Sequence, residues 1–422
     1  MHTKPSKRSS IPSELRLFLC INTLLSLLCL ATEAFSKYVR HRSNRYDVHN
    51  WPVFHFAQWL DFRCFIPRFH YLHQARFFSF EPALGVHFMY PAPGALLYAA
   101  FYLLPHPIGC FLAIVMLCVA FAVVRFYLSM RGAGLASVPS ATFCALTLAF
   151  SYPLWMEFFL GNMEICIWIF VAAGVWAFLS DKTYMAAAFF AIAGSIKIFP
   201  LVFLCLLLAR KKYRPIAFAV GLILVLNVIS LWVVCPNFYI AWHGIQNGLN
   251  DFRHVYVLSV NGEAGFDHSI FGLLKRGLSL LGRGHLPLTT LAHVELVYLP
   301  IVACVGFYLY FKYIRHLPVI NQVLSLCVIA ILFPPHSTDY TLMHLYVPLA
   351  LLALMAVRKP SMQYISGLTG AFICLAVLMS PETEFIYHGT TFGGQLKALV
   401  LIALLIIGLH YPFESCEPLC PE

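Results

Sequence analysis

Residues 184–209 read YMAAAFFAIAGSIKIFPLVFLCLLLA, with one charge, Lys197, near the middle. As one straight α-helix this stretch would be about 39 Å long at 1.5 Å per residue, whereas the hydrocarbon core of a bilayer is about 30 Å thick. Pro200 follows the lysine, and a proline inside a helix removes a backbone hydrogen bond and clashes with the preceding turn. The stretch therefore predicts a membrane-embedded segment that is broken or re-entrant.

Apolar runs of this kind occur along the whole chain. Of its 422 residues, 60% are apolar and 11% are charged, whereas soluble domains have about 45–50% and about 25%. We expect an all-α polytopic membrane protein, with one membrane-embedded domain over 1–422 and about 10–12 transmembrane helices, one or two of them broken or re-entrant. The other runs are 15–35, 94–105, 107–128, 138–160, 163–180, 215–234, 288–313, 318–333, 341–357, 362–379 and 395–412.

Basic clusters predict the orientation of the second half of the chain. They lie at 210–214, at Lys312 with Arg315, and at Arg358 with Lys359, with weakly charged loops between them. Because cytoplasmic loops carry the excess of Lys and Arg, we expect these clusters and both termini to be cytoplasmic. The first run resembles a secretory signal, but the many later spans favour an uncleaved first helix.

Two arrangements of the first half keep this orientation. If all twelve runs cross the membrane, Gly161 is cytoplasmic and Arg125 and Arg131 are outside. If 94–105 and 184–209 are broken or re-entrant, Gly161 is outside and the two arginines and Lys182 are inside. Charge placement favours the second arrangement. It also implies a site, because broken helices are tolerated in a membrane only where they line a polar cavity or are buried in protein.

Composition and motifs exclude several classes of function. The 28 basic residues against 18 acidic ones fit cytoplasmic loops, and we expect no nucleic acid partner. The 14 cysteines lie mainly in apolar runs, and Cys416 and Cys420 have no histidine at ligand spacing, so no metal site is predicted. No Walker loop, Rossmann glycine pattern, zinc-protease motif or nucleophile elbow is present, which argues against ATP-driven transport, nicotinamide chemistry and zinc or serine hydrolysis.

Two predicted outer segments are too long to be simple connections. Residues 36–93 contain seven basic and three acidic residues and six histidines, an excess of positive charge that suggests an anionic ligand. Residues 235–287 are rich in aromatic side chains, as expected of a segment that lies along the lipid headgroups.

Asp61 and Tyr90 are the candidate site residues of the first outer segment. Asp61 has few acidic neighbours, and its carboxylate could accept a proton from a hydroxyl; an interfacial ion pair with Arg63 or Arg68 is the alternative. Tyr90 begins Tyr-Pro-Ala-Pro, which favours an extended entry into the next run or an ordinary helix start.

A second group of candidates follows residue 156. Glu157, Asn162 and Glu164 cluster where two apolar runs meet, and Asn162 could either bind a ligand or cap the next helix. Lys197 is a functional candidate because a charge in the middle of the membrane costs about 2.5–3.5 kcal/mol on insertion scales. Its simplest partner is a phosphate or carboxylate, and the alternative is a side chain that extends to the interface.

A third polar group lies at 334–340 and His344. His336, Asp339 and Tyr340 fall where two runs meet on the predicted outer side, near enough in the topology to gather close to Asp61. An ordinary polar turn is the alternative, since short polar turns between spans are common.

Taken together, the motifs resemble glycosyltransferase family 87, the GT-C-fold mannosyltransferases that use polyprenyl-phosphate-mannose, and their relatives. The matching text is Asp61, Tyr90-Pro91-Ala92-Pro93, Gly161-Asn162-Met163-Glu164, Lys197 to Pro200, the basic turn Arg210 to Arg214, Asp267 to Leu274 and His336 to Tyr340. Residues 162 and 164 depart from the family's usual Gln and Asn.

The resemblance implies a GT-C-type fold and an inverting hexosyltransferase that needs no cofactor. A hexose, mannose first, would pass from a polyprenyl-phosphate donor to a hydroxyl of a lipid or glycan acceptor, at the outer face of a bacterial inner membrane. Asp61 would be the general base. Lys197 with Arg63, Arg68 or His336 would bind the donor phosphate, and sugar or acceptor binding would fall to Tyr90, Glu157, Asn162, Glu164, Asp339 and Tyr340.

Two other functions remain compatible with the sequence. A secondary transporter or flippase for a lipid-linked sugar also needs intramembrane charge and broken helices, although no internal repeat is visible. A non-catalytic subunit of a membrane assembly would leave Asp61 and Lys197 without a role.

Overall fold

The computed structural model describes residues 9–38, 60–78, 87–235, 237–260, 265–282, 286–358, 365–381, 386–387, 390–391 and 393–413. Of the predicted outer segment 36–93, Arg40, Arg42, Arg45, Asp47 and Glu81 lie outside the described residues, as do Cys416 and Cys420.

The described residues are almost entirely helical. The α-helices are α1 (Ser13–Tyr38), α2 (Leu60–Phe65), α3 (Ala92–Tyr102), α4 (Pro107–Gly132), α5 (Ser137–Ala149), α6 (Tyr152–Leu160), α7 (Glu164–Leu179), α8 (Thr183–Ile196), α9 (Leu204–Ala209), α10 (Tyr213–Val234), α11 (Phe238–Phe252), α12 (Ile270–Leu281), α13 (Leu288–Lys312), α14 (Val319–Leu332), α15 (Tyr346–Arg358), α16 (Ile365–Met379) and α17 (Gly393–His410). Short helical segments of other types are η1 (Ile66–Tyr71), η2 (Ala75–Phe78), η3 (Phe199–Phe203), η4 (Arg253–Val257), η6 (Ile314–His316) and η7 (Asp339–Leu345). Strands β1 (Ile386–Tyr387) and β2 (Thr390–Thr391) form one antiparallel pair.

Several helices are long and apolar enough to cross a membrane. Among the described residues there are six, or seven if a bent pair counts as one span, and five further apolar helices have 10–17 residues. The prediction of an all-α polytopic membrane protein is therefore confirmed. The six spans are Ser13–Thr32, Pro107–Gly132, Tyr213–Val234, Leu288–His316, Asp339–Arg358 and Gly393–His410.

The run 184–209 is broken where the sequence predicts it. Helix α8 ends at Ile196, and Lys197 has the extended backbone angles φ −138° and ψ 144°. Pro200 then lies in the first turn of η3, before α9 continues the run. The run 94–105 forms only the eleven-residue helix α3, which is too short to span a bilayer.

A second break lies in the run 138–160, which the sequence analysis treats as one element. Helices α5 and α6 meet at an angle of 48°. Phe150 and Ser151 separate them, and Pro153 lies in the first turn of α6, where a proline is tolerated but cannot extend the helix before it.

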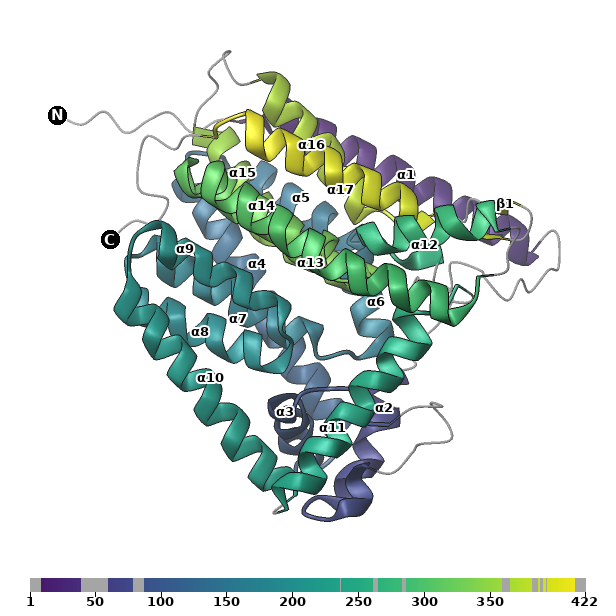
Figure 1. Cartoon of the computed structure of the whole chain (residues 1–422). Coiled ribbons are helices and arrows are strands. Elements are labelled where there is room, and N and C mark those ends of the chain that lie inside the picture. The colour runs from purple at the N-terminus through teal and green to yellow at the C-terminus, as the bar shows by residue number, and fades with distance from the viewer. Residues whose placement is uncertain are drawn as a thin grey trace.

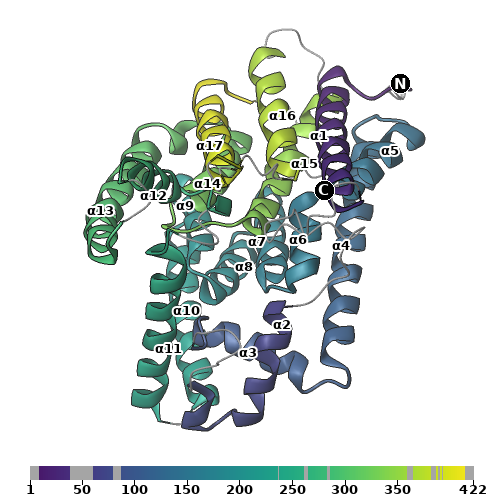
Figure 2. The ribbon, with the colours of Figure 1, turned by 90° about the vertical axis from the view of Figure 1, so that its right-hand side faces the viewer.

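The helices form two regions. Helices α1, α16, α17, α14 and α15 pack side by side at one end, and α2, α3 and α11 lie together at the other end (Figures 1 and 2). Helices α7 and α8 pack against each other between these regions. The main apolar core runs through α7, α8, α14, α15, α16 and α17, and includes Phe178, Phe190, Leu324, Leu352 and Phe372.

A separate aromatic core supports α2 and α3. Phe62 and Phe65 of α2 are fully buried against Tyr98, with ring centroids 5.7 and 5.6 Å from it. Phe65 also meets the Tyr90 ring edge-on at 5.5 Å. Edge-to-face aromatic pairs have a preferred geometry, so this core fixes the positions of Asp61 and Tyr90. Its other rings are Phe69, Phe77, Phe78, Phe88, Phe101, Phe111 and Phe158.

Gly248 allows α11 to pack closely against the backbone of Phe88, a residue of this aromatic core. A Cβ atom there would lie 1.8 Å from the backbone oxygen of Phe88, a contact that a side-chain rotation cannot relieve. We expect Gly248→Ala to destabilise the protein by about 1–3 kcal/mol, as overpacking does, and to lower the thermal unfolding midpoint. Gly221→Ala is the matched control, because nothing lies within 4 Å of the added methyl group. Equal midpoints for the two variants would contradict this packing.

Candidate active site

Asp61 lies in the first turn of α2 and is hydrogen-bonded to a residue 101 positions away. The Asn162 side-chain amide donates to the Asp61 Oδ2 atom at 2.6 Å and to the Tyr90 hydroxyl at 3.0 Å. Asn162 and Tyr90 are buried, whereas Asp61 is partly exposed. The Asp61 carboxylate is therefore held by a buried amide, in a residue that is itself only partly exposed.

The turn between α6 and α7 orients Asn162. Gly161 ends α6 in the left-handed region, at φ 64°, which favours glycine. The Asn162 Oδ1 atom then accepts a hydrogen bond from the Glu164 backbone N–H at 3.0 Å. The N-cap residue of α7 is Met163, so Asn162 lies one position before the cap that the sequence suggests for it; its oxygen binds the first backbone N–H of the helix, and its amide is directed at Asp61.

Lys197 reaches the same group from the break after α8. Its Nζ atom lies 2.5 Å from Glu164 Oε2 and 3.3 Å from Asn162 Oδ1. The ammonium also lies over the rings of Tyr340 and Tyr90, at 5.1 and 5.6 Å from their centroids. Because the backbone at Lys197 is extended, the side chain turns toward α7 rather than continuing along α8.

Glu164 is fully buried and has a partner on each carboxylate oxygen. Lys197 contacts Oε2, and the His344 Nε2 atom lies 2.6 Å from Oε1. Glu164 is also in the first turn of α7, where the helix dipole favours a negative charge. Asp61, Asn162, Lys197, Glu164 and His344 therefore form one continuous chain of polar contacts, called the Asp61 cluster below.

Burial raises the pKa of the Asp61 carboxyl above its ordinary value. The Asn162 hydrogen bond and the positive charge of Lys197 act in the opposite direction but do not cancel the effect of burial. Asp61 lies in α2, which is not among the membrane-spanning helices. A carboxyl with a raised pKa is a stronger base than an ordinary aspartate.

A second buried group of charges is centred on Asp267, which follows α11 and η4. The Lys275 Nζ atom lies 2.9 Å from Asp267 Oδ2, and the His336 Nδ1 atom lies 3.3 Å from the same oxygen. The backbone N–H groups of Ser269 and Ser337 both donate to Asp267 Oδ1 at 3.1 Å. This Asp267 cluster joins α12 to the turn before η7.

Segment η7 connects the two clusters. The Asp339 Oδ1 atom lies 2.9 Å from Lys397 Nζ of α17 and 3.9 Å from the ring of His268, the residue after Asp267. The adjacent Tyr340 lies beneath Lys197, and His344 reaches Glu164. Burial lowers the pKa of His268 to about 4, so this imidazole is neutral at neutral pH.

The structure brings together many, but not all, of the sequence-predicted residues. Tyr90, Asn162, Glu164, Lys197 and Tyr340 gather around Asp61.

The remaining predicted residues occupy other environments. Arg63 is exposed on α2, Arg68 is buried in η1, and the Glu157 carboxylate accepts a hydrogen bond from the Ile165 backbone at 3.3 Å. His336, expected beside Lys197, is instead a partner of Asp267, and Asp339 is a partner of Lys397.

The sequence predicts no site role for Asp267, Lys275 or Lys397, and it places His344 only within the third polar group, without a specific role. Lys397 has the same sequence feature that made Lys197 a candidate, because it is a charged residue inside an apolar run, 395–412. Asp267 and His344 lie in or beside short polar turns, and only the folded chain shows their partners. Among the described residues, no group of three or more His, Cys, Asp or Glu side chains is arranged to hold a metal ion.

Comparison with known proteins identifies the family. No curated protein and no solved structure matches the chain. The family model of glycosyltransferase family 87 matches residues 88–335, which include Tyr90, Asn162, Glu164, Lys197 and Asp267. This match covers more than half of the 422 residues, so the chain is a membrane glycosyltransferase that belongs to glycosyltransferase family 87.

Proposed function

We propose that the chain transfers a hexose, mannose first, from a polyprenyl-phosphate donor to a hydroxyl of a lipid or glycan acceptor, with inversion at the anomeric carbon. The observation that carries this proposal is the Asp61 cluster, in which two partly exposed residues, one with a carboxylate and one with an ammonium, share a buried partner, Asn162. A base for an acceptor hydroxyl and a cation for a departing phosphate are the two groups that such a transfer needs.

In the proposed step, the acceptor oxygen attacks the anomeric carbon while Asp61 takes the proton of the attacking hydroxyl. The new bond from the acceptor oxygen to this carbon forms as the bond from the carbon to the phosphate oxygen breaks. The electron pair of the broken bond leaves with the polyprenyl phosphate. Because the leaving group gains negative charge, the Lys197 ammonium stabilises the transition state more than the bound donor.

Glu164 would set the strength of this phosphate site. In the structure its carboxylate pairs with Lys197, so an incoming phosphate competes for the same ammonium. His344 contacts the other carboxylate oxygen, which leaves Glu164 with a hydrogen-bond partner when Lys197 turns to the donor. We propose that Tyr90 and Tyr340, whose rings flank the ammonium, line the donor sugar position.

The charge distribution supports an outward-facing site. The basic turn between α9 and α10 lies at the left of the molecule, whereas α2 and α3 lie toward the bottom (Figure 1). With this basic turn in the cytoplasm, α2 and its Asp61 lie on the side of the outer face, which we propose is the periplasmic side of a bacterial inner membrane.

A transfer assay tests the proposed function. Purified protein is incubated with synthetic polyprenyl-phosphate hexoses and a mixture of lipid and glycan acceptors, and both free hexose and new glycoside are measured. We expect new glycoside from at least the mannose donor. Movement of the intact donor across a liposome membrane without any new glycoside would favour a flippase, and transfer from nucleotide sugars alone would contradict the proposed donor.

The raised pKa of Asp61 predicts the pH dependence of transfer. A general base acts only when ionised, so kcat/KM should fall as the pH drops through the Asp61 pKa, which lies above that of an ordinary aspartate. Asn162→Ala removes a hydrogen bond that favours the carboxylate and should move this acid limb to higher pH. Asn227→Ala, which removes an amide that donates to the Ile223 carbonyl of its own helix, is the control. An acid limb unmoved by Asn162→Ala would argue against Asp61 as the titrating group.

A further inference from the structure

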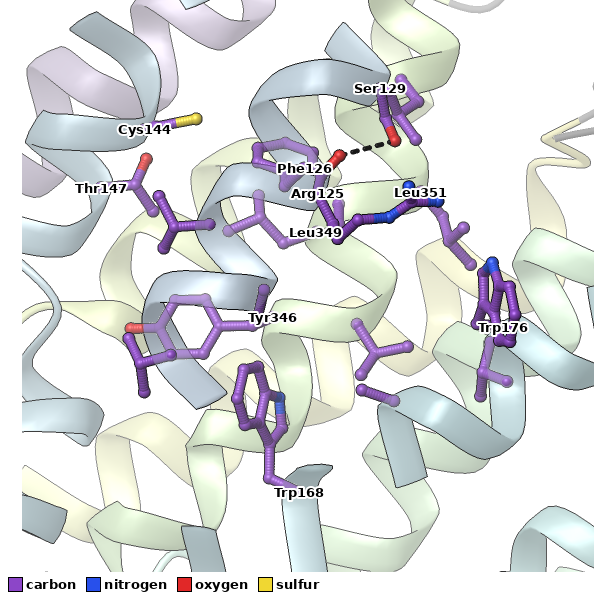
Figure 3. A pocket seen from close by; sticks show the side chains of 18 of the residues that line it. Arg125, Phe126, Ser129, Cys144, Thr147, Trp168, Trp176, Tyr346, Leu349 and Leu351 are labelled. Carbon is purple, nitrogen blue, oxygen red and sulfur yellow. Dashed lines mark hydrogen bonds between the residues drawn. The ribbon is translucent and has the colours of Figure 1, made fainter. Parts of the chain in front are cut away.

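A cavity of about 800 Å³ lies between α4, α5, α7 and α15, outside the Asp61 cluster (Figure 3). Its wall is mainly apolar and includes Phe126, Leu148, Val175, Leu349 and Leu351. The volume is in the range of pockets that bury small ligands, about 300–1,000 Å³. The cavity is therefore large enough for a hydrocarbon chain.

One end of the cavity carries cationic side chains. Arg125 of α4 and Lys182 both line it and are exposed. Trp176, also exposed, lies beneath the Lys182 ammonium at 5.1 Å, and tryptophan is enriched at the lipid headgroup level. Asp181 lines the same end, but its carboxylate is 3.5 Å from Arg210. This rim thus offers two exposed cations beside an exposed tryptophan.

Another part of the cavity wall is lined by polar and aromatic side chains. Tyr346 and Ser151 are hydrogen-bonded to each other there, and Trp168 and Met343 complete the wall. Trp168 lies one turn after Glu164 on α7, and Met343 precedes His344, so this wall separates the cavity from the Asp61 cluster.

The rim is too far from the Asp61 cluster to hold the reacting phosphate. Helix α7 runs from Glu164 to Leu179, about 24 Å at 1.5 Å per residue, and Lys182 lies beyond its end. A phosphate held at Arg125 and Lys182 therefore belongs to a different molecule from the sugar donor.

We propose that this cavity binds an anionic phospholipid of the cytoplasmic leaflet, with its phosphate at Arg125 and Lys182 and one acyl chain in the apolar interior. The charge of the rim selects the headgroup, because basic pockets between membrane helices on the cytoplasmic side bind anionic lipid headgroups. The bound chain packs against Met343 and Tyr346, next to the segment that carries His344. The lipid thus stabilises the segment that holds His344 in the Asp61 cluster, without taking part in the reaction.

Lipid selectivity tests the proposal. Purified full-length protein is delipidated in detergent and given phosphatidylglycerol or phosphatidylcholine with identical acyl chains, and bound lipid is measured by native mass spectrometry. We expect about tenfold more phosphatidylglycerol bound, together with a higher thermal unfolding midpoint. Equal retention of the two lipids by the unmodified protein would overturn the proposal without any variant.

Two variants and a control locate the bound lipid. The double variant Arg125→Gln, Lys182→Gln should lose the tenfold preference, whereas Lys211→Gln, Arg214→Gln, which removes two basic residues outside the cavity wall, should keep it. Ala172→Trp, which adds bulk to the cavity wall, should reduce binding of both lipids.

A competition experiment tests the alternative occupant. If added polyprenyl phosphate displaces phosphatidylglycerol, and if Ala172→Trp also reduces polyprenyl phosphate binding, the cavity belongs to the donor tail and the proposal is overturned. The proposed sugar transfer is measured separately and does not depend on these outcomes.

Discussion

Asp61→Asn is expected to reduce kcat/KM for sugar transfer by about 10²–10⁴, the contribution that a positioned general base typically makes. Asparagine has the same shape and its side-chain oxygen can still accept the hydrogen bond from Asn162, so the aromatic core and α2 should be unchanged. The loss should therefore appear in turnover, with little change in the thermal unfolding midpoint. Initial rates with a polyprenyl-phosphate-mannose donor measure it.

Asp251→Asn is the matched control for this prediction. Asp251 is another carboxylate near the aromatic core, where it lies 2.5 Å from the His87 ring and accepts the His87 backbone N–H at 2.8 Å. Its substitution removes the same negative charge away from the Asp61 cluster, so transfer should be retained. Full activity of Asp61→Asn would remove the base assignment.

Lys197→Ala is expected to weaken donor binding and to destabilise the fold. The substitution removes the cation beside a fully buried carboxylate, and breaking a buried ion pair from one side typically costs about 3–5 kcal/mol. It also removes the ammonium that we assign to the donor phosphate. Thermal unfolding in detergent measures the first effect, and the dissociation constant for polyprenyl phosphate measures the second.

A double variant separates these two effects. Lys197→Met, Glu164→Gln removes both charges of the pair, so no unpaired buried charge remains and stability should recover in large part. Donor affinity should stay low, because the phosphate still lacks its cation. Unchanged affinity for polyprenyl phosphate in either variant would assign Lys197 to packing or topology.

The sequence predicts those parts of the site whose signals are local. A lone lysine in an apolar run followed by a proline predicts both the chain break and a buried charge, and the structure has the break at Lys197. Asn162 between two apolar runs predicts a cap of the next helix, and the structure corrects this by one residue: the N-cap of α7 is Met163, and Asn162 accepts the Glu164 backbone N–H from the position before it.

The remaining features depend on contacts between distant segments. Asp61 and Asn162 meet across 101 residues, and Glu164 and His344 across 180, so their pairing follows from the packing of α2, α7 and η7. The bend between α5 and α6 was not predicted, because Pro153 occurs in a run whose hydropathy is continuous. His336 lies in the same polar turn as Asp339, and only the course of the turn directs its ring to Asp267.

The central claim is that one lipid-linked sugar phosphate contacts both Lys197 and Asp61. The most direct measurement is an experimental structure of the Asp61→Asn variant with polyprenyl-phosphate-mannose bound. We predict that a phosphate oxygen lies within hydrogen-bond distance of Lys197 Nζ and that the anomeric carbon lies on the side of residue 61, with room for an acceptor hydroxyl between them. A phosphate bound away from Lys197, or a sugar that faces away from residue 61, would contradict the account.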